Sequence, residues 1–507
     1  MKNFNSLFAR WIVKESKNLT KQDLKTDQTK AKRTYLHFDE RRHASSLSKY
    51  KKFFSNPDNI VKNAFWPFLH HTIKVTKIKN SNGKRKKKVK PRQVYYASHH
   101  DALIYSWYSF VLNESYYEDK LKKLGIDKSV IAYRQIPVYD GSNRNKCNVH
   151  FAEEVFSYIR KYDKECVAFV SDITGFFDNL DHEHLKKEWL SVLDLKETEE
   201  LPADHQVIYE NLTRFKYVDV SAVYESFNID FKRTYKKSNG KGKVYQVPVV
   251  NGEPITSILN EPYTRADFVS KIVKNGLIKG NENRNNKKKC PCGIMQGSPI
   301  SATLSNIYML SFDKTINDLV KEKGGLYRRY SDDLVVVCKN SDYEEVKNKI
   351  QSEIKKFELE INDDKTDTTI FKLDDKGQMR GFTIDMKHYK NMQYLGFVFN
   401  GQKIYVRSSS LTKYYRKMKS VIRKTLSMAF GKKSKTKNRK NLMFKKSLYK
   451  RFLFKGQRSF ISYALRSNLL LGGDSIKRQL GNRFNILHNY LTSKRRKRMF
   501  YYHKKHR

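Results

Sequence analysis

Residues 326–338 read LYRRYSDDLVVVC, two short runs with aromatic and β-branched residues on either side of a polar turn. This pattern predicts a β-hairpin that carries Asp332 and Asp333 at its tip. Adjacent acids in a turn are common for local reasons, because an Asp side chain readily accepts hydrogen bonds from the nearby backbone. The chemistry of this hairpin therefore depends on which other residues the chain brings to the same place.

A third acid stands at the end of another predicted strand. Residues 166–170, CVAFV, form an apolar run of strand length that leads through Ser171 into Asp172. The preceding residues 148–162 are predicted to form a helix. Carboxylates presented from two chain segments can hold two divalent ions about 4 Å apart, an arrangement that supports in-line displacement at phosphorus. Mg²⁺ suits such a site, because it binds one or two carboxylates and leaves positions for substrate phosphates.

The charge of the chain points to a polyanionic partner. Lys and Arg total 102 against 52 Asp and Glu among 507 residues, so the formal net charge is +50. A genome of low GC content favours lysine codons, and this accounts for part of the excess. A surface this positive also attracts nucleic acid, because each neutralised phosphate releases condensed counterions. Hydrophobic residues make up 39% and aromatic residues 13%, which predicts a folded protein rather than a disordered basic tail.

The remaining composition excludes several other classes of protein. Five cysteines in a chain of this length do not form a disulfide framework. Cys290 and Cys292 form a single C-x-C without a second pair at zinc spacing. We find no apolar run long enough for a signal peptide or a membrane span, so the cytoplasm is the expected location and no membrane partner is expected.

Five motifs, in the same order along the chain, resemble the palm motifs of bacterial reverse transcriptases. They are residues 170–178 (VSDITGFFD), 293–301 (GIMQGSPIS), 329–333 (RYSDD), 361–366 (INDDKT) and 394–397 (YLGF). The resemblance implies an RNA-directed DNA polymerase, a nucleotidyltransferase. It also implies a right-hand polymerase fold of the α+β class, with fingers, a palm with an antiparallel sheet, and a helical thumb.

The resemblance assigns roles to the acids and to one lysine. Asp172, Asp332 and Asp333 would be catalytic and would hold two Mg²⁺ ions, with Mn²⁺ as the alternative, and the carbonyl of Ile173 would assist them. Lys365 would be a general acid for the pyrophosphate leaving group. A solvated surface lysine is the alternative interpretation of Lys365.

Further residues match the positions that surround the incoming nucleotide in this family. Phe177 matches the steric gate that excludes a ribose 2′-hydroxyl, so dNTPs are the expected substrates; a plain core Phe is the alternative. Gln296 and Gly297 would lie beside the nucleotide, where a glycine lets the backbone approach closely. Tyr330 is assigned to the same substrate-binding group.

Contacts with the triphosphate and with the primer are also implied. Arg134 and Arg92 are candidates for triphosphate and template contacts, since guanidinium groups bind phosphate in a fork. Leu395 and Gly396 match the primer-grip turn, where the backbone meets the primer.

The motifs and the composition together predict the domain organisation. We expect a basic N-terminal extension at 1–90, fingers at 91–165, a palm at 166–405 with an insertion at about 186–289, and a helical basic thumb and C-terminal domain at 406–507. The residues from 91 to 163 have a largely helical pattern, the run at 84–88 is predicted to be a turn or loop, and 431–440 is predicted to be a basic linker.

Three shorter segments narrow the resemblance to one branch of the family. Residues 95–99 (YYASH), 132–134 (AYR) and 460–466 (FISYALR) are similar to the unknown-group, abortive-infection type of reverse transcriptase, which serves in antiphage defence. This implies a cognate structured noncoding RNA as template or scaffold, dNTPs as substrates and cDNA as product. The basic extension and the insertion are predicted to bind RNA or to mediate self-association into a homo-oligomer.

The alternatives are a retron-like or group II intron-like reverse transcriptase, an RNA-dependent RNA polymerase, and a catalytically silent RNA-binding or maturase-like protein. The ring of Phe177 opposes the RNA polymerase, and the intact Asp172, Asp332 and Asp333 oppose the silent protein.

Overall fold

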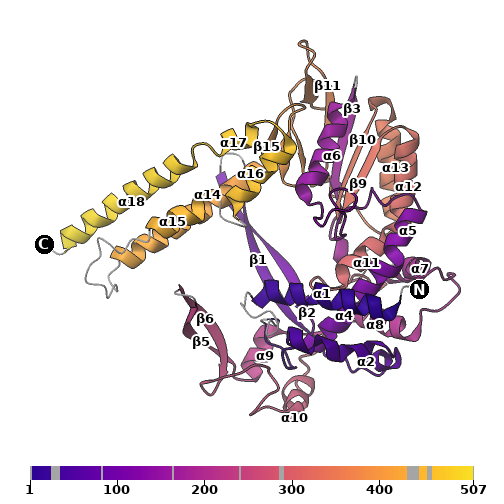
Figure 1. The fold of residues 1–507 in the computed structure, drawn as a ribbon, viewed down its shortest axis with the longest axis vertical. Coiled ribbons are helices and arrows are strands. Elements are labelled where there is room, and N and C mark those ends of the chain that lie inside the picture. Colours follow the sequence, from indigo (N-terminus) through magenta and orange to yellow (C-terminus); the bar gives the residue numbers. More distant parts are fainter. Residues whose placement is uncertain are drawn as a thin grey trace. The chain divides into compact units, whose positions relative to one another are not determined.

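The computed structural model describes residues 3–23, 33, 35–81, 84–162, 165–238, 241–284, 290–430, 445–453 and 459–505. The chain divides into two compact units, each built from three separate stretches. Unit 1 comprises Met1–Tyr133, Ile173–Ile316 and Lys349–Ile361, and unit 2 comprises Arg134–Asp172, Asn317–Asn348 and Asn362–Arg507. Helices and strands occur in both units, so the predicted α+β fold class is confirmed (Figure 1).

Unit 1 contains two sheets. The larger has the strand order β2-β1-β4-β8 and is formed by β1 (Phe68–Ser81), β2 (Lys84–Tyr96), β4 (Lys216–Asp219) and β8 (Lys279–Gly280). β1 and β2 form a long antiparallel hairpin, and β4 runs parallel to the first residues of β1. The smaller sheet has the order β5-β6-β7, with β5 (Asp230–Ser238), β6 (Lys241–Val250) and β7 (Glu253–Pro254).

Unit 1 also contains helices of various lengths. They are α1 (Phe4–Asp23), η2 (Ala44–Lys49), α2 (Tyr50–Phe54), α3 (Asp58–Val61), α4 (His99–Val111), η3 (Leu112–Tyr117), α5 (Glu118–Lys123), η4 (Phe176–Asp178), α7 (His182–Val192), α8 (Ala203–Thr213), α9 (Val220–Ser226), α10 (Arg265–Phe268), η5 (Val269–Val273) and α11 (Ser301–Tyr308). α12 (Leu310–Glu322) and α13 (Tyr343–Lys356) have residues in both units.

Two sequence predictions in unit 1 were wrong. The lysine run at 84–88 lies within β2, where a turn or loop was expected, and β2 continues to Tyr96, so the predicted helical region begins only with α4. The run carries no apolar residue, so it lacks the alternation that marks a strand, whereas pairing with β1 satisfies its backbone groups. The turn residues 82–83 lie outside the described residues.

The N-terminal stretch and the predicted insertion share one hydrophobic core. Leu36, Phe38 and Leu69 belong to the same buried cluster as Val218, Phe227 and other residues of the insertion. The insertion is therefore packed into unit 1 rather than appended to it. Its predicted role in RNA binding or self-association stays a prediction.

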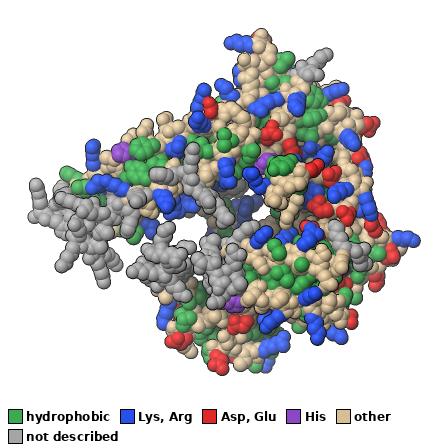
Figure 2. Space-filling model, viewed as in Figure 1, with side chains coloured by type: hydrophobic (Ala, Val, Ile, Leu, Met, Phe, Trp, Pro, Cys, Tyr) green, Lys and Arg blue, Asp and Glu red, His purple; other side chains and the backbone are tan. Residues whose placement is uncertain are grey.

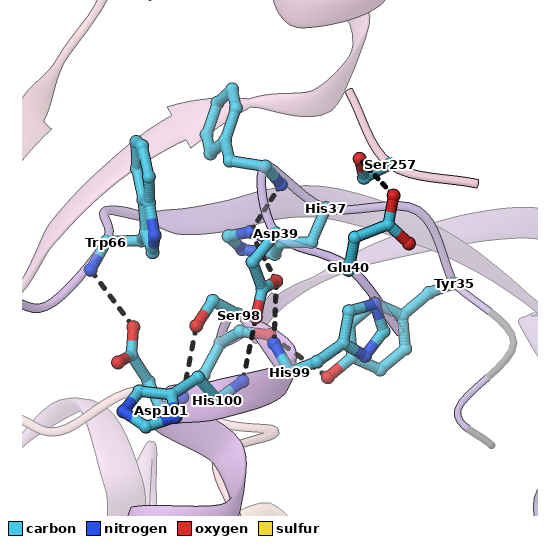
Figure 3. A network of polar contacts seen from close by, with 12 residues as sticks. Tyr35, His37, Asp39, Glu40, Trp66, Ser98, His99, His100, Asp101 and Ser257 are labelled. Atoms are coloured by element: carbon cyan, nitrogen blue, oxygen red, sulfur yellow. Dashed lines mark hydrogen bonds and ion pairs between the residues drawn. The ribbon is translucent and has the colours of Figure 1, made fainter. Parts of the chain in front are cut away.

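A buried polar network anchors the N-terminal stretch to α4 (Figure 3). The two carboxylate oxygens of Asp39 accept hydrogen bonds from the backbone N–H groups of His99 (2.9 Å) and His100 (2.8 Å), at the first residues of α4. A carboxylate is stabilised there by the free N–H groups of the first turn. Burial lowers the pKa of His99 to about 3 and the pKa of His100 to about 4, so both rings are neutral near pH 7.

Asp101 is the second acid of this network. Its carboxylate is almost fully buried and accepts from the backbone N–H of Trp66 (3.0 Å) and from the side chain of Asn63 (3.2 Å). Burial raises the pKa of Asp101 to about 7 from its ordinary value of 3.8, although these hydrogen bonds oppose the shift. The folded protein therefore holds this proton in a pH range where the unfolded chain has already lost it.

This shift predicts a stability that falls as the pH rises. The stabilisation from Asp101 is complete below about pH 4 and is lost as the pH approaches about 7. We expect the free energy of unfolding of wild type to fall more steeply between those values than that of Asp101→Asn. Urea unfolding followed by tryptophan fluorescence measures this, with Asp230→Asn on the exposed surface as the matched control. Parallel pH profiles for wild type and Asp101→Asn would contradict the assignment.

Unit 2 is built on one antiparallel sheet with the strand order β12-β11-β3-β10-β9. The strands are β3 (Cys166–Asp172), β9 (Leu326–Tyr330), β10 (Asp333–Cys338), β11 (Asp367–Leu373) and β12 (Met379–Phe382). The predicted hairpin at 326–338 and the predicted strand at 166–170 are thus both present. The predicted helix at 148–162 is α6 (Asn148–Arg160), which packs against the sheet through one hydrophobic cluster.

A small sheet and the C-terminal helices extend that cluster. They are β13 (Met392–Tyr394), β14 (Phe397–Phe399), β15 (Ile404–Val406), α14 (Ser408–Phe430), α15 (Lys445–Phe452), α16 (Phe460–Leu471), α17 (Ser475–Gln479) and α18 (Arg483–Lys505); the short turns η6 (Asn340–Asp342) and η7 (Asp363–Lys365) complete the unit. The helical C-terminal region is confirmed, while the predicted linker 431–440 lies outside the described residues. No described helix has the length and apolar composition that crossing a bilayer requires.

Candidate active site

The strand register brings two of the three predicted acids together. Asp333, the first residue of β10, is paired with Asp172, the last residue of β3. Paired residues of antiparallel strands lie on the same face, so both carboxylates share the face on which Ala168, Val335 and Val337 are buried. The acids therefore stand at one end of a packed, rigid surface.

The turn that carries Asp332 has an unusual backbone. Ser331 is buried and adopts a φ of +61°, a left-handed conformation that is uncommon for residues other than glycine. The guanidinium of Arg329 is also fully buried, and its Nη1 donates to the carbonyl of Ser331 at 3.1 Å. This bond supports the strained turn and so helps to position Asp332. Sequence reasoning missed Arg329, because its burial follows only from the strand packing.

Burial and neighbouring charges shift the ionisation of Asp332 and Asp333. Burial raises the pKa of Asp332, and the charge of Asp172 adds to the shift. The pKa of Asp333 is raised to about 6. Burial is the largest cause, and the negative charges of Asp332 and Asp172 raise this pKa further. Clustered carboxylates of this kind favour a bound cation, because a positive ion removes the repulsion. The oxygen donor set is also the one that Mg²⁺ prefers.

Lys365 lies in this cluster. Its Nζ donates a hydrogen bond to the Asp172 carboxylate, although the lysine side chain itself is 47% exposed. The short turn η7 presents it, and the N–H of Asn362 just before that turn bonds to the carbonyl of Asp172 at 2.8 Å. The structure thus places the predicted general acid next to a predicted metal ligand.

Among the described residues, no group of three or more His, Cys, Asp or Glu side chains is arranged so that it could hold a metal ion by itself. Polymerase-type Mg²⁺ sites take part of their coordination from substrate phosphates and water. Asp172, Asp332 and Asp333 would therefore need phosphate or water ligands to complete a Mg²⁺ site.

Four other predicted site residues, Arg134, Tyr330, Leu395 and Gly396, also belong to unit 2. Leu395 (φ +42°) and Gly396 (φ +92°) form the tight turn between β13 and β14, and Arg407 N–H donates to the Gly396 carbonyl at 3.0 Å. The charge of Arg407 lowers the pKa of Asp333, against the stronger effect of burial, so this arginine is a neighbour that sequence reasoning missed. Tyr330 and Arg134 are both partly buried.

Phe177, Gln296 and Gly297, the nucleotide-side residues predicted to lie beside the incoming nucleotide, belong to unit 1 and lie together there. The carbonyl of Phe177 accepts a hydrogen bond from the N–H of Ile294 at 2.8 Å, so the Phe177 segment contacts the motif at 293–301. In that motif the carbonyl of Gln296 accepts from the N–H of Tyr95 in β2 at 2.8 Å. Ile173 is buried and forms an isolated bridge with Ile361, and Arg92 is exposed on β2.

Gly297→Ala is expected to disrupt this arrangement. Gly297 has a φ of +120°, and a Cβ added there would lie 2.2 Å from the carbonyl oxygen of Tyr95. Because the clash is with backbone, relieving it must shift β2 or the Gln296 turn, at a cost of about 1–3 kcal/mol. We expect dNTP incorporation to fall roughly tenfold or more in primer-extension assays. Gly125→Ala is the control, since Gly125 also has a positive φ but nothing lies within 4 Å of its added Cβ; equal activities in the two variants would contradict the prediction.

Comparison with known proteins adds one family match. Residues 256–399, less than a third of the chain, match the family model described as reverse transcriptase (RNA-dependent DNA polymerase). The match indicates the domain of an RNA-directed DNA polymerase, a nucleotidyltransferase, and such domains use divalent metal ions. The antiparallel sheet and its helices fit the predicted polymerase-like fold. No curated protein matched the chain.

Solved structures similar to this chain include telomerases. Apo telomerase from Candida tropicalis truncated from the C-terminal domain is 11% identical. The match covers 71% of this chain and 60% of the telomerase chain, with a TM-score of 0.33. A second structure, apo telomerase from the same organism, is 14% identical. That match covers 75% of this chain and 58% of the telomerase chain, with a TM-score of 0.33. Telomerase from Candida albicans in complex with a TWJ fragment of telomeric RNA is 12% identical. The match covers 90% of this chain and 66% of the telomerase chain, with a TM-score of 0.31. The chain thus spans about 60% of the length of the Candida tropicalis structures.

Proposed function

We propose that this chain, which carries a reverse transcriptase domain, is an RNA-directed DNA polymerase that copies an associated noncoding RNA into cDNA in bacterial defence against phage. The polymerase part is supported above all by the pairing of Asp333 with Asp172 across β10 and β3, with Asp332 in the adjoining turn. Carboxylates fixed on a packed sheet meet the need of catalysis for precise positioning of the reacting groups.

In the proposed reaction, the primer 3′-hydroxyl loses its proton to water, its oxygen forms a bond to the α-phosphorus of a dNTP, and the bond from that phosphorus to the pyrophosphate oxygen breaks. Two Mg²⁺ ions, or Mn²⁺, would neutralise the attacking and leaving oxygens when bound. Asp172, Asp332 and Asp333 would hold the ions together with the carbonyl of Ile173. Lys365 would give its proton to the leaving pyrophosphate, a role supported by its contact with Asp172.

Phe177, Gln296 and Gly297 would receive the sugar and base of the nucleotide. The ring of Phe177 offers no hydrogen-bond partner to a 2′-hydroxyl, so the site would select dNTPs. Tyr330, Arg134 and the backbone of Leu395 and Gly396 would contact the substrate or primer, as their motifs imply.

The proposed template is RNA, and the charge of the molecule supports a polyanionic partner. The net charge is +50, and Lys and Arg side chains are spread over most of the face drawn in Figure 2. The more specific part, a cognate structured noncoding RNA and an antiphage role, rests on the motifs at 95–99, 132–134 and 460–466. Self-association through the N-terminal extension or the insertion is also proposed, from the charge and position of these two segments.

The test is to purify the protein from its host, sequence the bound RNA and DNA, and repeat with Asp332→Ala. We expect one host RNA to be enriched in both preparations and cDNA complementary to it only in wild type. Phage challenge of cells that carry either form measures the defence role. Bound RNA without cDNA, and equal protection by both forms, would instead identify a catalytically silent RNA-binding protein.

A further inference from the structure

Unit 1 contains an open pocket of about 730 Å³ that includes none of the proposed catalytic or nucleotide-side residues. Its walls come from residues 64–68, 210–216 and 265–278, three stretches far apart in the sequence. The parallel pairing of β1 with β4, which matches Phe68 to Tyr217, brings the first two stretches to the same end of the sheet. A volume of this size is ample for a nucleotide, since ligand pockets of ~300–1,000 Å³ are typical.

An aromatic wall lines the pocket. Trp66 is half-buried, stacks on Phe38 with ring centroids 5.5 Å apart and meets Phe268 edge to face at 5.1 Å. Its backbone N–H is held by the buried carboxylate of Asp101, as Figure 3 shows. The indole is therefore fixed before any ligand arrives, which lowers the entropy cost of ordering this wall when a ligand binds.

Exposed cations complete the pocket. The guanidinium of Arg265 lies over the Trp66 ring at 5.4 Å, and Arg214 and Lys216 are exposed in the same lining. The acid in this lining is Glu210, whose carboxylate already accepts a hydrogen bond from Gln206 at 2.7 Å. Fixed aromatic rings beside unburied guanidinium and ammonium groups match the two parts of a nucleotide, a flat base and an anionic phosphate.

We propose that this pocket binds one unpaired nucleotide of single-stranded RNA, with the base stacked on the Arg265 guanidinium that lies over Trp66 and a phosphate near Arg214 and Lys216. This goes beyond the polymerase function, because the pocket would retain RNA whether or not that RNA is being copied. A duplex would not enter it in the same way, because its bases are stacked inside the helix.

The test compares charge-matched variants. Arg214→Gln/Lys216→Gln removes two cations from the pocket, and Lys51→Gln/Lys52→Gln removes two exposed cations from α2, so both lower the net charge equally. The probes are a fluorescent single-stranded RNA 12-mer, a duplex of equal length, and AMP as the free nucleotide, all measured by anisotropy or competition on the full chain. We expect the pocket variant to bind the single strand about tenfold more weakly than the α2 variant and the duplex equally well.

A second measurement does not depend on any substitution. Single-stranded RNA that carries 5-iodouridine should photocross-link to the peptide containing Trp66 or Phe268. If AMP competes at the pocket as well as the RNA strand does, the site recognises a free nucleotide and the RNA assignment is overturned. Equal single-strand affinities of the two variants, with no cross-link, would overturn the proposal altogether. Primer extension measured in parallel separates this failure from a failure of the polymerase proposal, because an active enzyme with an unused pocket contradicts only the pocket.

Discussion

Asp332→Asn should lower the rate of dNTP incorporation by roughly 1000-fold while leaving RNA binding unchanged. The substitution keeps the volume of the side chain but removes a negative charge from the cluster with Asp172 and Asp333. Metal ions supply several kcal/mol of transition-state stabilisation, and each 1.36 kcal/mol changes the rate tenfold. Single-turnover primer extension over a range of Mg²⁺ concentrations measures the effect.

The control for this prediction is an acid of the same unit that lies outside the cluster. Asp375 is exposed in the connection between β11 and β12, so Asp375→Asn removes the same charge without touching the carboxylate cluster. We expect that variant to keep wild-type rates. If Asp332→Asn retained more than about a tenth of the wild-type rate, the two-metal assignment of Asp172, Asp332 and Asp333 would be wrong.

Phe177→Ala should relax the choice of sugar. We expect the ratio of rNTP to dNTP incorporation to rise roughly 5- to 150-fold, because burying a 2′-hydroxyl against a ring without a partner costs about 1–3 kcal/mol. The half-buried position of Phe177 and its backbone bond to Ile294 of the 293–301 motif support a place beside the nucleotide. Competition between radiolabelled rNTP and dNTP on one primer–template measures the ratio.

Phe231→Ala serves as the matched control, because Phe231 is 43% exposed in β5 and lies in another part of unit 1. Its sugar ratio should equal that of wild type. An unchanged ratio in Phe177→Ala, together with a lowered melting temperature, would show that this ring is an ordinary core residue.

The sequence predicted those elements whose signal is local. Alternation and turn residues predicted the hairpin at 326–338, and both of its strands, β9 and β10, are present. The helical region expected at 406–507 is also present, as the helices α14 to α18.

Non-local pairing accounts for what the sequence did not reveal. The run at 84–88 lies in a strand because β1 supplies its hydrogen bonds, which no local pattern records. The burial of Arg329 under the Ser331 turn and the proximity of Arg407 to Asp333 likewise follow from packing between distant segments. The pocket around Trp66 has the same origin, since it is assembled from three separate stretches.

By itself, the sequence determined which residues this protein offers for chemistry. Asp172 follows an apolar strand and Asp332 and Asp333 sit in a turn, and these are properties of short segments. Only the tertiary structure decided that Asp333 stands opposite Asp172, because strand register depends on pairing between segments that are far apart in the chain. The same packing raises the pKa of Asp333 to about 6, since burial and neighbouring charges arise only when the chain is folded.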